Sequence, residues 1–206
     1  HLDQYPLDPL LKRASPGCEI LAVGSVTEGA ACTVLSSKSL INNENELMIA
    51  NCDQWVDIVI DEYLEAMEAA HWDGFIMTMT SEDPKWSYLR ANDDGKVTEV
   101  VEKQVISHEA TVGIYNYRQG KFFVEAAEVM ISKNLRVNNE FYVAPAYNEM
   151  ISQGREIGFF NVGGDGEGMH GLGTPEDLEN FLKLVISEKA AKERSHQAAK
   201  CLSSAA

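Results

Sequence analysis

The segment Leu47–Gln54 constrains the fold more than any other part of the sequence. An apolar run, Leu-Met-Ile-Ala, ends abruptly in Asn51, Cys52 and the lone carboxylate of Asp53. We interpret the run as a buried strand that delivers Asp53 to the carboxyl edge of a sheet, where ligands bind in open α/β sheets. A carboxylate held there is suited to Mg²⁺, which prefers oxygen ligands. The alternative is that Asp53 merely caps a following helix.

Size and charge narrow the class of protein. The chain has 206 residues, which predicts one domain over residues 1–188, with residues 189–206 as a helical extension and tail. A net charge of −15 argues against nucleic acid and anionic membranes as partners. We find no apolar stretch of membrane-spanning length and no signal peptide, and no two of the four cysteines have metal-ligand spacing. We therefore expect a reduced, cytoplasmic protein, with Cys52 buried and homo-oligomerisation possible.

Strand-like and helix-like segments alternate along the chain. We predict strands at 46–51, 74–80, 86–91, 96–102, 111–117 and 155–162, with a short strand-like run at 19–23. Helices are predicted at 28–37, 57–71, 119–133 and 142–153, and from Thr174 onward. This order predicts an α/β, Rossmann-like fold with a mixed, mostly parallel sheet flanked by helices.

The turn Asn92–Gly95 favours a β-hairpin between the strands at 86–91 and 96–102. Residues 84–118 are therefore expected to form a smaller lobe over the site. We expect Trp86, which opens this hairpin, to pack in the core, with a place in the pocket as the alternative.

Six short motifs occur along the chain in a fixed order. They are Thr27–Ala31, Asn51–Asp53, Val101–Lys103, Val112–Tyr115, Asn139–Tyr142 and Gly173–Leu178. With them, the chain resembles the nucleotidyltransferases that join a nucleoside triphosphate to a sugar phosphate or a similar phosphorylated small molecule. The resemblance extends from about residue 20 to residue 182 and implies transfer of a nucleoside monophosphate with release of pyrophosphate.

The resemblance implies a role for particular residues. Asp53 and Lys103 would be the catalytic residues, with Asp53 holding Mg²⁺ against the nucleotide phosphates and Lys103 balancing the acceptor phosphate. The acceptor would be a sugar phosphate or a phosphorylated amino alcohol used in surface polysaccharide. The nucleotide would contact Glu28, Gly29, Ala30 and Asp53, and the acceptor would contact Glu102, Lys103, Gly113 and Glu140.

Each role has a simpler structural alternative. Lys103 is otherwise a surface lysine at a strand end, and the two glutamates are otherwise simply solvated. Gly113 either lets the ligand approach the backbone or marks a bulge in its strand.

Glu28 stands where the resembled family usually has Gln. A carboxylate accepts hydrogen bonds and donates none, so it favours a base with an amino group, and we expect CTP to be preferred to UTP or dTTP. The alternative is that Glu28 is an acid in the first turn of a helix.

Two departures from the family bear on activity. The second metal ligand, an Asp in the family, is Gly171 here, and Asp165 or His170 is the candidate replacement. The family's first strand and glycine-rich triphosphate loop are missing, so His1 corresponds to a point about 60 residues into such an enzyme, counting βα units of about 30 residues. We therefore expect the sequence to be a fragment of a longer polypeptide.

Two other functions remain open. A glycosyltransferase that uses a nucleotide sugar has a related fold, but it usually has an Asp-x-Asp pair, and Asn51 stands two residues before Asp53. A non-catalytic nucleotide-binding or regulatory module is the second alternative. Release of pyrophosphate would separate the nucleotidyltransferase from both.

Overall fold

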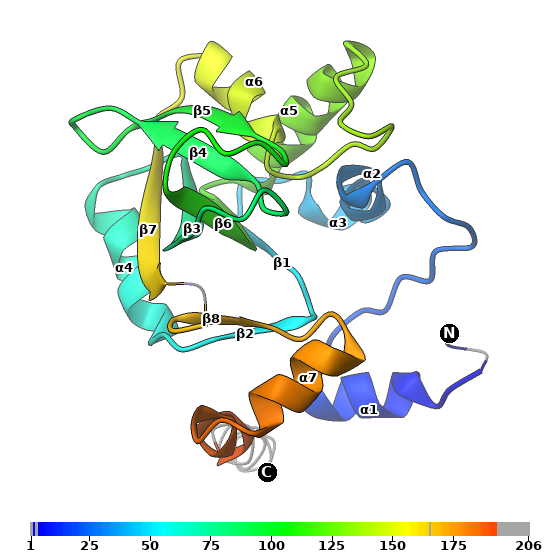
Figure 1. Cartoon of the computed structure of the whole chain (residues 1–206). Helices are drawn as coiled ribbons and strands as arrows, with labels where there is room; N and C mark the ends of the chain where they lie inside the picture. Colours follow the sequence, from blue (N-terminus) through cyan, green and yellow to red (C-terminus); the bar gives the residue numbers. More distant parts are fainter. Residues whose placement is uncertain (1, 3, 165, 193–206) are drawn as a thin grey trace. The chain divides into compact units, whose positions relative to one another are not determined.

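The structure, a computed structural model, describes residues 2, 4–164 and 166–192 (Figure 1). They form two compact units: residues 25–171, and residues up to 24 together with those from 172 onward. The predicted end of the domain at residue 188 stays a prediction.

The larger unit is a mixed sheet with helices on both faces, which confirms the predicted fold class. Five strands follow the order β5-β4-β6-β3-β7, and β1 also pairs with β6. These strands are β1 (Leu47–Ala50), β3 (Gly74–Thr80), β4 (Tyr88–Ala91), β5 (Val97–Val101), β6 (Glu109–Tyr117) and β7 (Ile157–Gly164). The helices are α2 (Ala30–Leu35), α3 (Lys38–Ile41), α4 (Ile60–Ala69), α5 (Gly120–Ser132) and α6 (Ala146–Ser152). A separate ladder joins β2 (Gln54–Val56) to β8 (Met169–Gly171).

The direction of the strands differs in one respect from the prediction. β1, β3, β4 and β7 all run the same way, as the alternation predicted. However, β6 runs against them and lies between β1 and β3, so β3–β7 is the one parallel pair among the described strands of this sheet. The periodicity of a segment indicates that it is a strand, but it does not say which strand will lie beside it.

One edge of β6 is shared by two strands. β1 pairs with residues 114–117 of β6, and β4 pairs with residues 109 and 110 of the same edge. Where the β1 ladder ends, three residues of β6 (112–114) lie opposite the single residue Met77 of β3, which is a bulge. The chain therefore leaves a break in the sheet edge, bounded by the end of β1 and the start of β4.

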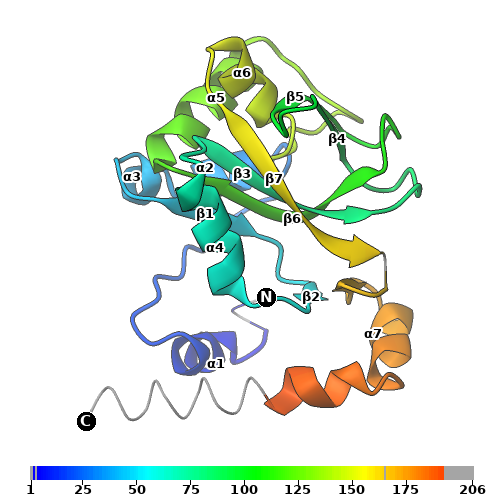
Figure 2. The same cartoon turned by 90° about the vertical axis from the view of Figure 1, so that its left-hand side faces the viewer.

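Two apolar cores cover the two faces of the sheet. α5 and α6 pack on one face through Phe123, Met130 and Tyr147, and α4 packs on the other through Tyr63 and Met67. Figure 2 shows α4 on the face opposite α5 and α6. Along β3, Phe75 and Met77 belong to the α4 core while Ile76 belongs to the α5–α6 core, as the alternation of side chains along a strand requires.

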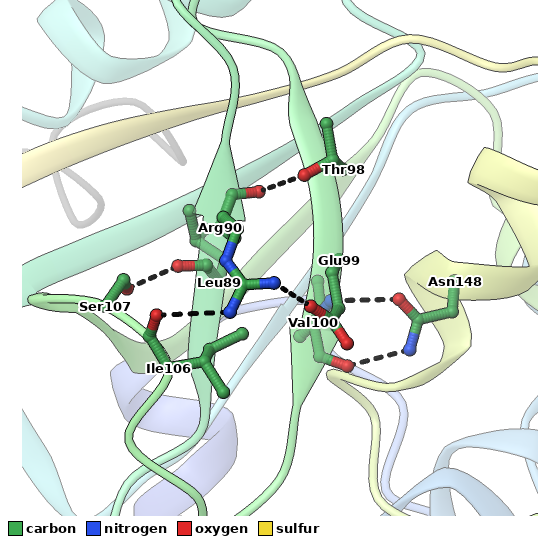
Figure 3. Close-up of polar contacts among 8 residues, drawn as sticks. All are labelled: Leu89, Arg90, Thr98, Glu99, Val100, Ile106, Ser107 and Asn148. Atoms are coloured by element: carbon green, nitrogen blue, oxygen red, sulfur yellow. Dashed lines mark hydrogen bonds and ion pairs between the residues drawn. The ribbon is translucent and has the colours of Figure 1, made fainter.

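The β4–β5 hairpin predicted from Asn92–Gly95 is confirmed and is fastened to α6 (Figure 3). The side-chain amide of Asn148 accepts a hydrogen bond from Val100 N (2.9 Å) and donates one to Val100 O (2.7 Å). Arg90 and Glu99 form an ion pair across the hairpin (2.6 Å). These contacts fix the end of β5 immediately before Glu102.

The smaller unit contains helices α1 (Leu7–Ala14) and α7 (Pro175–Leu182), and residues 186–192 are also helical. α7 begins as predicted: Thr174 Oγ1 accepts from Asp177 N (3.1 Å), and Asp177 Oδ2 accepts from Thr174 N (3.1 Å). Residues 19–23 form no strand, contrary to expectation, and α1 was not predicted. The rest of the predicted tail, 193–206, lies outside the described residues. Within the described residues, no helix has the length and apolarity needed to cross a membrane.

Candidate functional site

A cavity of about 230 Å³ opens at the break in the sheet edge. Its wall comes from the residue after β1, the residues before β4, the turn after β5, the bulged part of β6 and the segment before α6, together with the first residue of α2. Four of the predicted site residues, which come from three separate parts of the sequence, meet in this wall: Ala30, Glu102, Lys103 and Gly113.

Glu102 is the buried charge of the cavity. Its side chain accepts a short hydrogen bond from Ser87 Oγ, and the residue is 8% exposed. Burial raises the pKa of the Glu102 carboxyl, while the bond from Ser87 and the charge of Lys103 oppose the rise. The simple solvation considered for Glu102 is therefore wrong: it is a largely desolvated acceptor at the cavity wall.

Lys103 is exposed and directed by an aromatic neighbour. Its ammonium donates to the hydroxyl of Tyr142 (3.0 Å) and lies 5.1 Å from the centre of the same ring. The bond to Tyr142 and the nearby carboxylates of Glu102 and Glu140 raise the pKa of Lys103. Its backbone has φ 54°, a left-handed conformation that an ordinary side chain rarely adopts. A cation is thus held at the cavity wall beside the buried carboxylate.

Gly113 lies in the bulge of β6, so the structural alternative for this residue is confirmed. Its φ is 77°, and a Cβ at this position would lie 2.3 Å from Asn51 Nδ2. Asn51 N also donates to Gly113 O (3.0 Å). The glycine therefore lets the end of β1 close onto the bulge, in the wall of the cavity.

The segment before α2 is tied to the segment before α6. Phe141 N donates to Glu28 O (2.8 Å), and Ala31 N donates to Phe141 O (2.9 Å). Gly29 has φ 127°, and a Cβ there would lie 2.5 Å from the Phe141 backbone, so glycine is needed for this contact. The carboxylate of Glu28 forms an ion pair with Arg136.

Asp53 lies in the exposed turn between β1 and β2, and Cys52 beside it is exposed, contrary to the predicted burial. The β2–β8 ladder pairs Gln54 with Gly171, so Asp53 lies next to the position where the resembled family has its second carboxylate. His170 is 8% exposed and packs against Trp55, with ring centres 5.6 Å apart. Asp165, the other candidate ligand, lies outside the described residues.

The carboxylate of Asp53 is enough for one mode in which proteins bind Mg²⁺. No group of three His, Cys, Asp or Glu side chains within the described part of the chain is placed to hold a metal. However, Mg²⁺ is often bound through one or two carboxylates together with substrate phosphates and water. The exposed carboxylate of Asp53 fits that pattern, whereas a site built from protein ligands alone does not.

The remaining cavity residues were not predicted as site residues, although Trp86 was an open alternative. They are Asn51, Lys85, Trp86, Ser87, Thr111, Tyr115, Tyr142, Val143 and Ala144. A signal was present for Thr111 and Tyr115, because they alternate with Gly113 along one strand and so share its face. Their hydroxyl groups lie 3.0 Å apart, and burial raises the pKa of Tyr115 to about 12. The sequence gives no such signal for Ser87, because its hydrogen bond is to Glu102, which lies in the turn after β5.

Comparisons with known proteins bear on the fold. No protein-family model matches the chain, and a search of curated proteins finds no match. Among solved structures, a nucleoside-diphosphate-sugar pyrophosphorylase from Vibrio cholerae RC9 is similar with a TM-score of 0.64 at 22% identity, covering 79% of this chain and 68% of that one.

Two further structures are similar. A protein from Bacillus anthracis assigned as a glucose-1-phosphate thymidylyltransferase, in complex with sucrose, has a TM-score of 0.64 at 17% identity over 84% of this chain and 70% of that one. A UDP-glucose pyrophosphorylase complexed with UDP-glucose has a TM-score of 0.53 at 17% identity over 66% of this chain and 55% of that one. The chain therefore has the Rossmann-like fold of the sugar-phosphate nucleotidyltransferases, as the six motifs implied.

Proposed function

We propose that this chain belongs to an enzyme that transfers a nucleoside monophosphate from a nucleoside triphosphate to a sugar phosphate. The observation that carries the proposal is the cavity wall, where Glu102, Lys103, Gly113 and Ala30 come together from three motifs of the resembled family. The similar structures, named as pyrophosphorylases and a thymidylyltransferase, support the same reaction class.

In the proposed reaction, an oxygen of the acceptor phosphate attacks the α-phosphorus of the nucleotide. A new P–O bond forms, the bond from the α-phosphorus to the bridging oxygen breaks, and pyrophosphate leaves. Positioning and neutralisation of charge supply most of the catalysis in such transfers. Lys103 binds the acceptor phosphate, Glu102 and Glu140 accept hydrogen bonds from acceptor hydroxyl groups, and the Glu28–Ala30 segment and Asp53 contact the nucleotide.

Mg²⁺ is the proposed cofactor, and Asp53 is the residue that would hold it. The metal would neutralise phosphate charge and orient the phosphates. The exposure of Asp53 leaves it accessible to a nucleotide-bound ion.

The cavity favours a sugar phosphate over a phosphorylated amino alcohol. The nitrogen of a phosphorylated amino alcohol is cationic, and in its quaternary form such a group binds over aromatic rings. Here Lys85 Nζ already lies 4.8 Å from the centre of the Trp86 ring, and Lys103 occupies the corresponding place over Tyr142. An organic cation would meet these two lysines, whereas phosphate oxygens and sugar hydroxyl groups would find donors and the acceptor Glu102.

We further propose CTP as the preferred nucleotide, because the carboxylate of Glu28 accepts hydrogen bonds from the amino group of cytosine. Within the cell we place the enzyme in the cytoplasm, where it would supply a nucleotide sugar for polysaccharide assembly.

The decisive experiment incubates the protein and Mg²⁺ with each nucleoside triphosphate and a panel of sugar phosphates. Pyrophosphate release and the nucleotide-sugar product are measured together, with Asp53→Asn as the control that removes the metal-binding charge. We expect pyrophosphate to appear with CTP and to fall at least tenfold in the variant. Release of a nucleoside diphosphate from a supplied nucleotide sugar would instead identify a glycosyltransferase.

The position of Gly171 favours a second candidate, a nucleotide-binding module without catalysis. The residue next to Asp53 across the β2–β8 ladder carries no carboxylate. Nucleotide binding with no turnover, in a chain shown to contain the whole domain, would establish this candidate.

A further inference from the structure

Glu28 does not act as a lone carboxylate. Its Oε2 atom forms an ion pair with Nη2 of Arg136, a residue 108 positions along the chain. The Glu28 side chain is 65% exposed and that of Arg136 is 29% exposed, so both groups are accessible to a ligand. Exposed ion pairs contribute little to stability, so the ion pair between Glu28 and Arg136 is not accounted for by folding alone.

The guanidinium group of Arg136 is held on several sides. Its Nε donates to Asn134 Oδ1 (2.7 Å), and Nη1 donates to Asn139 O (3.2 Å). The group stacks on the ring of Phe141, with 4.1 Å between the guanidinium carbon and the ring centre. A guanidinium fixed by these contacts presents its remaining N–H groups in a defined plane.

The segments that carry the pair continue into the wall of the cavity described above. Phe141, on which Arg136 stacks, is hydrogen-bonded to the backbone of Glu28 and Ala31. Ala30, in the same segment as Glu28, lines the cavity, and so does Tyr142, which follows Phe141. Both chain segments that carry the pair therefore lead directly into the cavity wall.

The chemistry of the pair resembles that of an amide. Glu28 keeps Oε1 as an acceptor, and Arg136 has five N–H groups, of which the contacts with Asn134, Asn139 and Glu28 use one on each nitrogen. Acceptor and donor thus lie side by side, whereas a carboxylate alone offers an acceptor.

We propose that Glu28 and Arg136 read the nucleotide base as one unit, which makes Arg136 a specificity-determining residue. Glu28 accepts a hydrogen bond from the exocyclic amino group of cytosine, and Arg136 donates to the adjacent ring nitrogen and carbonyl oxygen. In uracil or thymine a carbonyl replaces the amino group, and the ring nitrogen carries a hydrogen. The acceptor Glu28 would then face an acceptor, and the donor Arg136 would face a donor. This assignment rests on the proposed function, because it requires the nucleotide to bind at this segment.

Isothermal titration of the protein with CTP, UTP and dTTP in the presence of Mg²⁺ tests the proposal without requiring turnover. We expect the wild-type protein to bind CTP about tenfold to a hundredfold more tightly than UTP, the discrimination typical of a paired donor and acceptor reading a base. Arg136→Met keeps an apolar stem on Phe141 but removes the donors, so the ratio should fall towards one. Arg136→Lys keeps the charge but loses the planar fork, and it should lose most of the same discrimination.

Arg155→Met is the matched control. Arg155 also forms an ion pair, with Glu125 (3.5 Å), and stacks on an aromatic ring, that of Phe122 (3.4 Å), with 25% of its side chain exposed. Its replacement should leave the affinity for all three nucleotides unchanged, and the melting temperature of every variant verifies that it is folded.

The outcomes separate this inference from the proposed function. If the wild-type protein binds nucleotides but folded Arg136→Met keeps the wild-type ratio, the role of Arg136 is overturned and the nucleotide site stands. Tighter binding of UTP or dTTP than of CTP to the wild-type protein overturns the assignment to cytosine. Absence of nucleotide binding by a wild-type chain shown to contain the whole domain overturns the proposed function, and this inference with it.

Discussion

The hydroxyl group of Ser87 donates a hydrogen bond to the buried carboxylate of Glu102 in the wall of the cavity. Ser87 immediately precedes β4, and its carbonyl oxygen accepts from Thr111 N (2.8 Å), so the donor is itself fixed to β6. Glu102 follows β5, whose end is held by Asn148. The two ends of one hairpin therefore set the place and the environment of this acid.

The raised pKa of Glu102 predicts a pH dependence of stability. A carboxyl whose pKa is higher in the folded state binds its proton more tightly there, so its contribution is complete below the unfolded value, about 4.5, and is lost as pH rises through the folded pKa. Relative to Glu102→Gln, the wild-type protein should lose unfolding free energy as pH increases above that value. Urea unfolding of both proteins between about pH 4 and pH 8 measures the difference. A constant difference across this range would contradict the prediction.

Gly113→Ala should destabilise the protein more than a glycine-to-alanine substitution that strains the backbone but causes no steric clash. The left-handed conformation costs a residue with a Cβ about 1–2 kcal/mol, and here the new methyl group would also displace Asn51 from the end of β1. Gly95→Ala is the control, because Gly95 has φ 76° but nothing within 4 Å of an added Cβ. We expect a loss of about 1 kcal/mol at Gly95 and about 2–4 kcal/mol at Gly113. Equal losses in chemical denaturation would show that contact with Asn51 is unimportant.

Lys103→Met should weaken binding of a hexose 1-phosphate. Hydrogen bonds to charged groups contribute about 1.5–3 kcal/mol, so a loss of about tenfold or more in affinity is expected. Calorimetric titration measures the affinity, with Lys121→Met as the control, since Lys121 lies on α5 and forms an ion pair with Glu44 (3.0 Å). Unchanged affinity in folded Lys103→Met would remove the lysine from the acceptor site.

Asn148→Ala should release the end of β5. The substitution leaves the backbone N–H and C=O of Val100 without their partner, and unpaired buried groups cost about 1–3 kcal/mol each. Asn43→Ala is the matched control, because Asn43 also accepts from one backbone N–H and donates to one carbonyl, but in an exposed turn. Unfolding free energies should fall by about 2–4 kcal/mol for Asn148→Ala and by less than about 1 kcal/mol for Asn43→Ala. A similar fall for both variants would show that burial of the Val100 groups is not the cause.

Local sequence signals predicted most elements of the fold. The Asn92–Gly95 turn, the capping pattern at Thr174 and the apolar runs that became β1 and β3 all depend on nearby residues, and they lie where they were expected. The insertion of β6 between β1 and β3 could not be predicted in this way, because pairing between strands depends on contacts across the fold.

In the cavity, too, the residues in local motifs could be predicted, whereas their partners from distant segments could not. Glu102, Lys103 and Gly113 were identified from short motifs, and the structure places them together in the wall. Their partners Ser87 and Asn51 lie just before β4 and just after β1, and Arg136 reaches Glu28 from a distant segment. A sequence motif names a residue, but it does not name the neighbour that sets its charge or its orientation.

The break in the edge of β6 separates the pairing of the β4–β5 hairpin from the pairing of β1. Residues 114–117 pair with β1 and residues 109 and 110 pair with β4, and the bulge at residues 112–114 lies where the β1 ladder ends. A change in the length or register of the hairpin therefore reaches only the first part of the strand, and the ladder with β1 keeps its alignment. The same strand edge therefore holds two neighbours separately, β1 through four residue pairs and β4 through two, so the hairpin is the less extensively paired of the two.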